Sequence, residues 1–169
     1  MQGQARWGSR APTMAEALAE LDRVAEIMMT LAGFALDGMT RDAGWRFLSI
    51  GRRVERMQFL CSLLRGSMTL GEGADLDWML ELADSIVTYR SRYMARPQWL
   101  PVLDLLLTDD SNPRSVAFQL GGLIDYLRRL EAAYGPCGAR ELEPLHAELA
   151  GLAASAGLAP GTPRLRPLV

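Results

Sequence analysis

Apolar residues recur every three or four positions along most of this chain, and no window alternates polar and apolar residues cleanly. This spacing puts apolar side chains on one face of an α-helix, whereas strict alternation is typical of a half-buried β-strand. Helices of this kind build a core only by packing their apolar faces on each other. The sequence therefore predicts an all-α fold, a helical bundle of about five to six helices.

Signals at helix ends divide the chain. Thr13 followed three residues later by Glu16 predicts a capping box, in which side chains satisfy the free N–H groups of a first helical turn. Asn112 followed by Pro113 predicts another helix start, because proline is harmless at the first helical position. The predicted helices cover approximately residues 13–38, 41–64, 76–94, 102–107, 113–134 and 140–156.

The length of 169 residues suits a single domain with a sizeable core. We assign the helical domain to residues 13–157. The segments 1–12 and 158–169 show no helical period, and the second is rich in proline. We expect both segments to be flexible.

Charge and composition exclude several classes of protein. A net charge of −2 leaves no basic footprint for nucleic acid. No apolar run reaches the ~18 residues that a membrane span needs, and the N-terminus has no secretory signal core. Cys61 and Cys137 lie far apart without a paired histidine. The sequence therefore predicts no disulfide framework, no metal site and no cofactor, and it favours a cytoplasmic protein.

The stretch "SIGRRVERMQFL", residues 49–60, places charged side chains in the middle of a helix that is apolar on two sides. At 100° per residue, Arg52 and Arg56 fall on the face of Phe59 and Leu63, with Glu55 at its edge. An unpaired charge inside a bundle is costly, so each of these groups needs a partner. We expect Glu55 to be largely buried and bonded to arginine side chains or to a helix start.

A second predicted helix repeats this pattern. Arg90 stands on its apolar stripe between Ile86 and Met94, so we expect this guanidinium to point into the bundle interior as well. One interpretation of the internal charges is a salt-bridge network that fixes helix register. The other is a pocket for an anion, because a guanidinium matches carboxylate and phosphate groups.

The segment "SNPRSV" leaves a similar choice open. Asn112 can cap the following helix, or Ser115 and the free N–H groups of the helix start can bind an anionic group. Cys61 is interpreted as a core residue and His146 as a surface or packing residue. No nucleophile lies in a recognisable pair with a base, so the sequence assigns no catalytic residue.

Three blocks occur in order along the chain: "MTRDAGWRFLSIGRRVERM", "YRSRY" and "LLLTDDSNPRSVAFQL". Together they resemble the alpha-E family, an all-helical bacterial family of the DUF403 class that is named for a Glu-Arg motif. The resemblance covers roughly residues 31–130. Family members typically carry two copies of a "GRxxER" helix, each followed by a "D-x-x-P-x-S" helix start. This chain has one copy of each and resembles the second half. We therefore expect a fragment of a longer protein, or a chain whose first half has been lost.

The resemblance also implies a context. Genes of this family occur beside, or fused to, circularly permuted ATP-grasp and transglutaminase-like proteins. It implies a non-catalytic accessory or partner module of a ligase system that forms amide or peptide bonds or modifies peptides. Glu55 and Arg56 are then the motif pair. The whole set of candidate residues, for an anion site or a structural network, is Arg52, Glu55, Arg56, Tyr89, Arg90, Arg92, Asp109, Arg114 and Ser115.

The alternative function is a ligand-independent helical scaffold or oligomerisation module, and an enzyme in its own right is the weakest option. A helix that keeps two apolar faces needs cover on both. We expect the face of Phe47, Ile50, Val54 and Met57 to be covered by a homodimer partner or by a protein such as an ATP-grasp ligase. The other possibility is that the last predicted helix folds back over this face.

Overall fold

The computed structural model describes residues 11–155 and divides into two units, one that ends at Trp45 and one that begins at Arg46. The first unit contains α1 (Met14–Gly38), and α2 (Ala43–Leu70) starts there and continues through the second unit. The flexible segments predicted at 1–12 and 158–169 lie almost wholly outside the described residues.

The predicted capping box begins α1. The backbone N–H of Glu16 donates to the Thr13 hydroxyl at 3.3 Å, and the N–H of Thr13 donates to the Glu16 carboxylate at 2.7 Å. This reciprocal pair satisfies two of the N–H groups that a first helical turn leaves without partners. The sequence prediction of this helix start is confirmed.

The second helix differs from its prediction at both ends. The Asp42 carboxylate accepts the N–H of Trp45 at 3.1 Å, so Asp42 caps α2 and the helix begins at Ala43. The helix passes through Gly66 and ends at Leu70. Gly71 has φ 56°, the left-handed conformation in which helices commonly end. Gly66 does not have a positive φ, so the helix continues through it.

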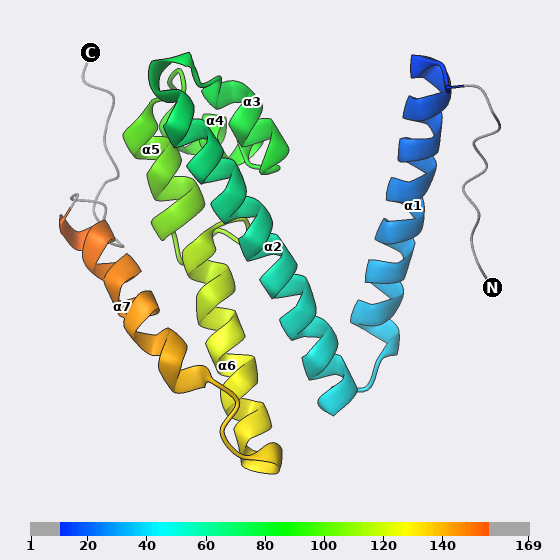
Figure 1. The fold of residues 1–169 in the computed structure, drawn as a ribbon, viewed down its shortest axis with the longest axis vertical. Coiled ribbons are helices and arrows are strands. Elements are labelled where there is room, and N and C mark those ends of the chain that lie inside the picture. The colour runs from blue at the N-terminus through cyan, green and yellow to red at the C-terminus, as the bar shows by residue number, and fades with distance from the viewer. Residues whose placement is uncertain (1–10, 156–169) are drawn as a thin grey trace. The chain divides into compact units, whose positions relative to one another are not determined.

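Five more helices follow in the second unit (Figure 1). They are α3 (Leu76–Leu82), α4 (Ile86–Tyr93), α5 (Trp99–Leu103), α6 (Val116–Tyr134) and α7 (Ala139–Ser155). A single 3₁₀ turn, Gly71–Gly73, precedes α3, and a π-helical segment, Asp104–Thr108, continues α5. Helices α6 and α7 pack side by side.

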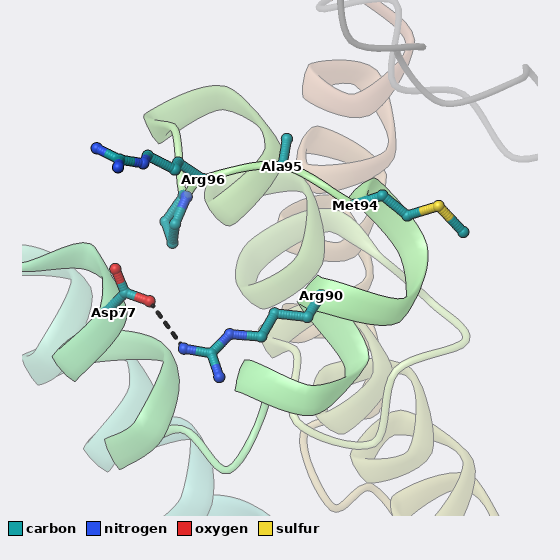
Figure 2. Close-up of a pocket in the computed structure, with 6 residues that line it drawn as sticks. Asp77, Arg90, Met94, Ala95 and Arg96 are labelled. Atoms are coloured by element: carbon teal, nitrogen blue, oxygen red, sulfur yellow. Dashed lines mark hydrogen bonds and ion pairs between the residues drawn. The ribbon is translucent and has the colours of Figure 1, made fainter.

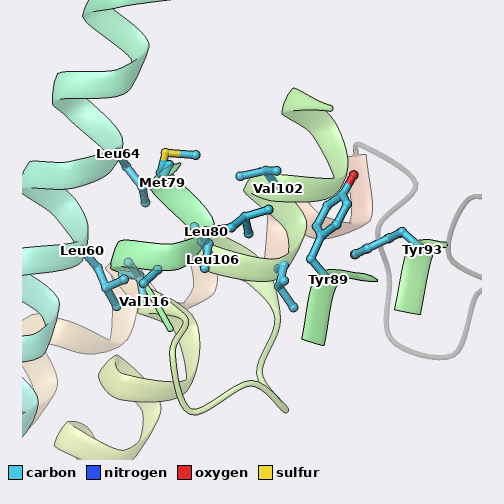
Figure 3. Close-up of a cluster of buried hydrophobic side chains, with 11 residues drawn as sticks. Leu60, Leu64, Met79, Leu80, Tyr89, Tyr93, Val102, Leu106 and Val116 are labelled. Atoms are coloured by element: carbon cyan, nitrogen blue, oxygen red, sulfur yellow. The ribbon is translucent and has the colours of Figure 1, made fainter. Parts of the chain in front are cut away.

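The main core of the second unit gathers side chains from five helices and the π-helical segment (Figure 3). Leu60 and Leu64 enter it from α2, and Tyr89 and Tyr93 enter it from α4. A smaller cluster of Leu120, Ile124 and Ala139 lies between α6 and α7, with Met57 of α2 packed against it. Both clusters fix one side of α2 against the rest of this unit.

The all-α prediction is confirmed, because residues 11–155 form seven α-helices and no strand. The number of helices exceeds the prediction because residues 76–94 are two helices and not one. Asp84 has φ 49°, a left-handed conformation that interrupts the helical hydrogen bonds between α3 and α4. The prediction of Cys61 in the core is wrong, since this side chain is exposed.

No helix within residues 11–155 combines the length and the apolar composition that crossing a bilayer requires.

Candidate functional site

The buried side of α2 decides which of its charges become part of a site. Leu60 and Leu64 are 2% and 5% exposed. At 100° per residue, Arg53 lies about 20° from Leu60, Arg56 about 40° and Arg52 about 80°. All three arginines are half-buried. Arg53 therefore lies between Leu60 and Leu64 on the helix face that packs on the core, and Arg56 and Arg52 lie towards one edge of that face.

Arg53 ties α2 to α6. Its guanidinium donates to the Gln119 side-chain oxygen at 3.0 Å and to the Phe118 carbonyl at 3.4 Å. It also lies 5.4 Å from the Phe118 ring centroid and 5.5 Å from that of Tyr126, within the range of cation–π attraction. A Cβ on Gly122 would lie 2.3 Å from the guanidinium carbon, so the absence of a side chain there lets Arg53 lie flat on α6.

A fourth half-buried arginine joins these three from the turn before α6. Arg114 donates to the Asp84 carboxylate in the break between α3 and α4. We call Arg52, Arg53, Arg56 and Arg114 the arginine cluster. Among residues 11–155, no hydrogen bond or ion pair is made by Arg52 or Arg56.

The pKa of Arg56 responds to the charges around it. Burial is the main effect that lowers the pKa of Arg56, and the positive charges of Arg114, Arg52 and Arg53 lower it further. Asp84 raises the pKa and opposes these effects. The cluster therefore carries a surplus of positive charge against one carboxylate.

The prediction that Glu55 is buried in a charge network is wrong. Glu55 is exposed and makes no ion pair with any of the residues 11–155. It lies about 140° around the helix from Leu60, which places its carboxylate on the solvent side. Sequence reasoning took the face of Phe59 as the interior, but Phe59 is 48% exposed.

Arg90 is also not internal. Its guanidinium lies 3.3 Å from the Asp77 carboxylate, and both side chains are more than half exposed. The break at Asp84 changes the direction of the chain, so the stripe drawn through residues 76–94 does not exist. Asp77 and Arg90 face each other in an open pocket of about 470 Å³ (Figure 2). The other lining residues are Met94, Ala95, Arg96 and Pro97.

Arg92, Asp109 and Ser115 belong to a separate, structural network. Arg92 pairs with the fully buried carboxylate of Asp109, which also accepts the Ser111 hydroxyl at 2.6 Å. The Ser115 hydroxyl donates to the Asp109 carbonyl and accepts the N–H of Phe118 at 3.0 Å. Ser115 is therefore the N-cap of α6 and its hydroxyl is used within the chain.

Asn112 caps the turn before α6. Its side-chain oxygen accepts the N–H of Arg114 at 3.0 Å, and its amide donates to the Leu105 carbonyl at 2.8 Å. The predicted bond to a backbone N–H is confirmed. The helix begins at Val116 and not at Pro113, because Ser115 takes over as N-cap.

Tyr89 is fully buried beside Tyr93, with the two ring centroids 4.7 Å apart. Its hydroxyl accepts the N–H of Gln98 at 3.1 Å and donates to the Arg96 carbonyl at 3.3 Å. Burial raises the pKa of Tyr89, which keeps the hydroxyl protonated. This side chain anchors the segment between α4 and α5.

Sequence reasoning missed three members of these networks. Arg53 was not among the candidates, although it is in phase with Leu60 and Leu64, which could have identified it. Asp84 and the buried Asp104, which accepts the Tyr93 hydroxyl at 2.6 Å, gave no local signal. Among the described residues, no group of three or more His, Cys, Asp or Glu side chains could hold a metal ion.

The all-helical architecture and the single Glu-Arg dipeptide, Glu55-Arg56, identify the class of protein. The chain belongs to the Alpha-E family, described as "a predicted alpha-helical domain with a conserved ER motif", and the match covers residues 4–161. It is similar to "Uncharacterized protein Rv2567" of Mycobacterium tuberculosis and "Uncharacterized protein Mb2597" of Mycobacterium bovis. Each is 35% identical over 113 residues, which are 64% of this chain.

The aligned part is only 13% of the length of these relatives, so the chain spans a small portion of the proteins that it matches. No solved structure matches the chain.

Proposed function

We propose that this domain is a non-catalytic accessory module that holds an anionic group of a substrate or partner protein through Arg52, Arg56 and Arg114. The observation that carries this proposal is the arginine cluster, in which the guanidinium groups of Arg52 and Arg56 make no hydrogen bond or ion pair with residues 11–155. Guanidinium groups bind carboxylates and phosphates through paired hydrogen bonds. An anion bound at the arginine cluster compensates the surplus positive charge of these side chains.

Two further observations favour a binding module over a ligand-independent scaffold. A closed salt-bridge network would pair Glu55 with the arginines, but Glu55 faces solvent. The hydroxyl of Ser115 and the carboxylate of Asp109 are used in capping and pairing, which leaves the arginines as the groups open to a ligand.

The ligase context of the proposal rests on the family resemblance. A system that joins carboxylates to amines with ATP handles carboxylate and phosphate groups, which are the anions that arginine recognises. We therefore propose that the domain serves an ATP-grasp-type ligase or peptide-modification system. The much greater length of the relatives fits a module that works alongside other domains.

A titration tests the binding proposal directly. The Nε–H signals of arginine side chains are followed by NMR while sodium acetate and sodium phosphate are added separately at constant ionic strength. We expect the signals of Arg52 and Arg56 to shift, and the binding to disappear in an Arg52→Ala/Arg56→Ala variant. Arg90→Ala is the matched control, since Arg90 is exposed outside the cluster. Unchanged arginine signals with both anions would reject the function.

A further inference from the structure

We propose that the arginine cluster selects a doubly charged phosphate group over a single carboxylate, and that Asp84 is its built-in competitor for Arg114. This inference rests on the proposed function and adds to it the class of ligand and an internal regulator. It depends on the charges and contacts around α2, the break at Asp84 and the start of α6.

The first argument is the number of charges. The cluster has four half-buried guanidiniums: the charges of Arg52, Arg53 and Arg114 lower the pKa of Arg56, and Asp84 is the one carboxylate among the groups that alter that pKa. A surplus of three positive charges remains. A single carboxylate leaves two of them without compensation, whereas a phosphate monoester near neutral pH carries up to about two negative charges. The dianion is the better match.

The second argument is the distribution of the available donors. Arg53 is held by neutral acceptors, the Gln119 side chain and the Phe118 carbonyl, so it contributes a fixed positive charge without being neutralised. Arg52 and Arg56 lie one turn apart on α2 and project from the same edge of the helix. The guanidinium groups of Arg52 and Arg56 on one helix face, and that of Arg114, offer several N–H donors. Such a set of donors suits a tetrahedral anion with several oxygens.

The third argument concerns Asp84. Its carboxylate takes a hydrogen bond from Arg114 and acts on Arg56 as well, so it lies at the edge of the same cluster. The Asp84 side chain is 73% exposed, and an exposed ion pair is weak and readily exchanged. An incoming phosphate therefore competes with Asp84 for Arg114 without a large change in the fold.

The test compares two ligands of the same shape and different charge. Methyl phosphate is mainly a dianion at pH 7.5, whereas methyl sulfate is a monoanion with the same tetrahedral geometry. We expect methyl phosphate to bind at least about fivefold more tightly than methyl sulfate or acetate, and to shift the Nε–H signals of Arg52 and Arg56. A phosphorylated small molecule and a lipid headgroup present the same phosphate group. Binding to vesicles that contain phosphatidic acid is therefore measured separately, to distinguish these two sources of the ligand.

Matched variants test the competitor. Asp84→Asn removes the charge, and asparagine tolerates the left-handed backbone at this position. We expect this variant to bind methyl phosphate about threefold more tightly than the unaltered protein. Asp77→Asn is the control, because Asp77 is an exposed carboxylate paired with Arg90 and not with the cluster. An equal change in both variants overturns the role of Asp84.

The outcomes separate the inference from the proposed function. Equal affinities for methyl phosphate, methyl sulfate and acetate overturn the preference for a dianion and leave anion binding intact. Binding that shifts the signals of Arg90 or Arg96 instead of Arg52 and Arg56 assigns the ligand to another site and overturns the inference. Absence of binding by all three anions rejects the proposed function and the inference together.

Discussion

The Glu-Arg pair of this domain divides between two environments. The Arg56 side chain is half-buried at the edge of the core, and the neighbouring Glu55 side chain faces solvent. Consecutive helical residues point about 100° apart, so two adjacent side chains rarely share one pocket. Glu55 is thus open to solvent, while Arg56 lies against the rest of the second unit.

Replacement of Glu55 is expected to leave the fold intact. Because the side chain is exposed and makes no ion pair within residues 11–155, Glu55→Gln should change the free energy of unfolding by less than about 0.5 kcal/mol. Chemical denaturation measures this change. Charge reversal, Glu55→Arg, then tests whether copurification with an ATP-grasp-type ligase depends on this residue. A loss of several kcal/mol in Glu55→Gln would place the carboxylate in a buried network instead.

Arg92 and Arg90 are expected to differ in their effect on stability although they are two residues apart. Arg92→Met keeps the alkyl chain but leaves the buried Asp109 carboxylate without its guanidinium, at a cost of about 2–4 kcal/mol. Arg90→Met breaks an exposed pair and should cost less than about 0.5 kcal/mol. Urea unfolding of both variants measures the difference. Equal losses contradict the assignment of Arg92 to the structural network.

Tyr89 is expected to make stability depend on alkaline pH. Burial raises its pKa in the folded protein, whereas in the unfolded chain a tyrosine ionises near pH 10, at about its ordinary value. Its contribution is complete below that pH and is lost as pH rises through the folded value. Tyr89→Phe should lower the free energy of unfolding by about 1 kcal/mol at pH 7. Above pH 10, the free energy of unfolding of this variant should fall less steeply with pH than that of the unaltered protein. Unfolding at pH 8 to 11 measures both slopes, and parallel slopes refute the assignment.

At the scale of the elements, the turn before α6 depends on Asn112. The side chain is 5% exposed and bonds to the Arg114 N–H and the Leu105 carbonyl. Asn112→Ala removes both bonds and should cost about 1–2 kcal/mol. Asp110→Ala, at an exposed position in the same turn, should cost less than about 0.5 kcal/mol. Thermal and urea unfolding compare the two variants, and equal stability of both argues against Asn112 as the key to this turn.

The break between α3 and α4 has a consequence for the site. Asp84 occupies the residue with φ 49°, and the same residue presents its carboxylate to Arg114. A continuous helix over residues 76–94 would carry Asp84 in regular helical geometry, with no turn to present it. The interruption of the helix therefore places at Asp84 a carboxylate that pairs with Arg114 and raises the pKa of Arg56.

At the scale of the whole molecule, the described part of the second unit exposes apolar surface on α2 and α6. Phe47 is 56% exposed and lies against Tyr134, which is 62% exposed, with ring centroids 6.1 Å apart. Further along the same face, Ile50 and Val54 are half-buried, and Met57 packs against the smaller cluster between α6 and α7. Helix α6 lies against part of this face, through Tyr134 and the cluster that Met57 joins, and Phe47 stays more than half exposed.

We predict that the exposed surface at Phe47 contributes to a homodimer or to contact with another protein. Phe47→Asp should shift the sedimentation coefficient at micromolar concentration towards that of a monomer, because a charge in an apolar interface is costly. Phe59→Asp is the matched control, since Phe59 is 48% exposed on another face of α2. Sedimentation velocity measures both variants. A monomer before any substitution, or dissociation by the Phe59 variant alone, contradicts the prediction.

The sequence by itself determined the helical content, because the apolar spacing, the Thr13 capping box and the Asn112 turn are local and act within a few residues. It also identified the family, whose Glu-Arg motif is a contiguous string. It placed Arg52 and Arg56 in the bundle interior, whereas the structure leaves both side chains half-buried. These features depend on residues that are close together along the chain.

Tertiary structure decided which apolar face of α2 is buried, and with it the roles of Glu55 and Arg53. A helix with two apolar faces offers two ways to pack, and only the side chains of α3, α4 and α6 select between them. The left-handed residue Asp84 moved Arg90 to the surface, since one such residue redirects everything that follows. The approach of Arg114 to the arginines of α2 joins residues more than 50 positions apart, and only three-dimensional packing creates it.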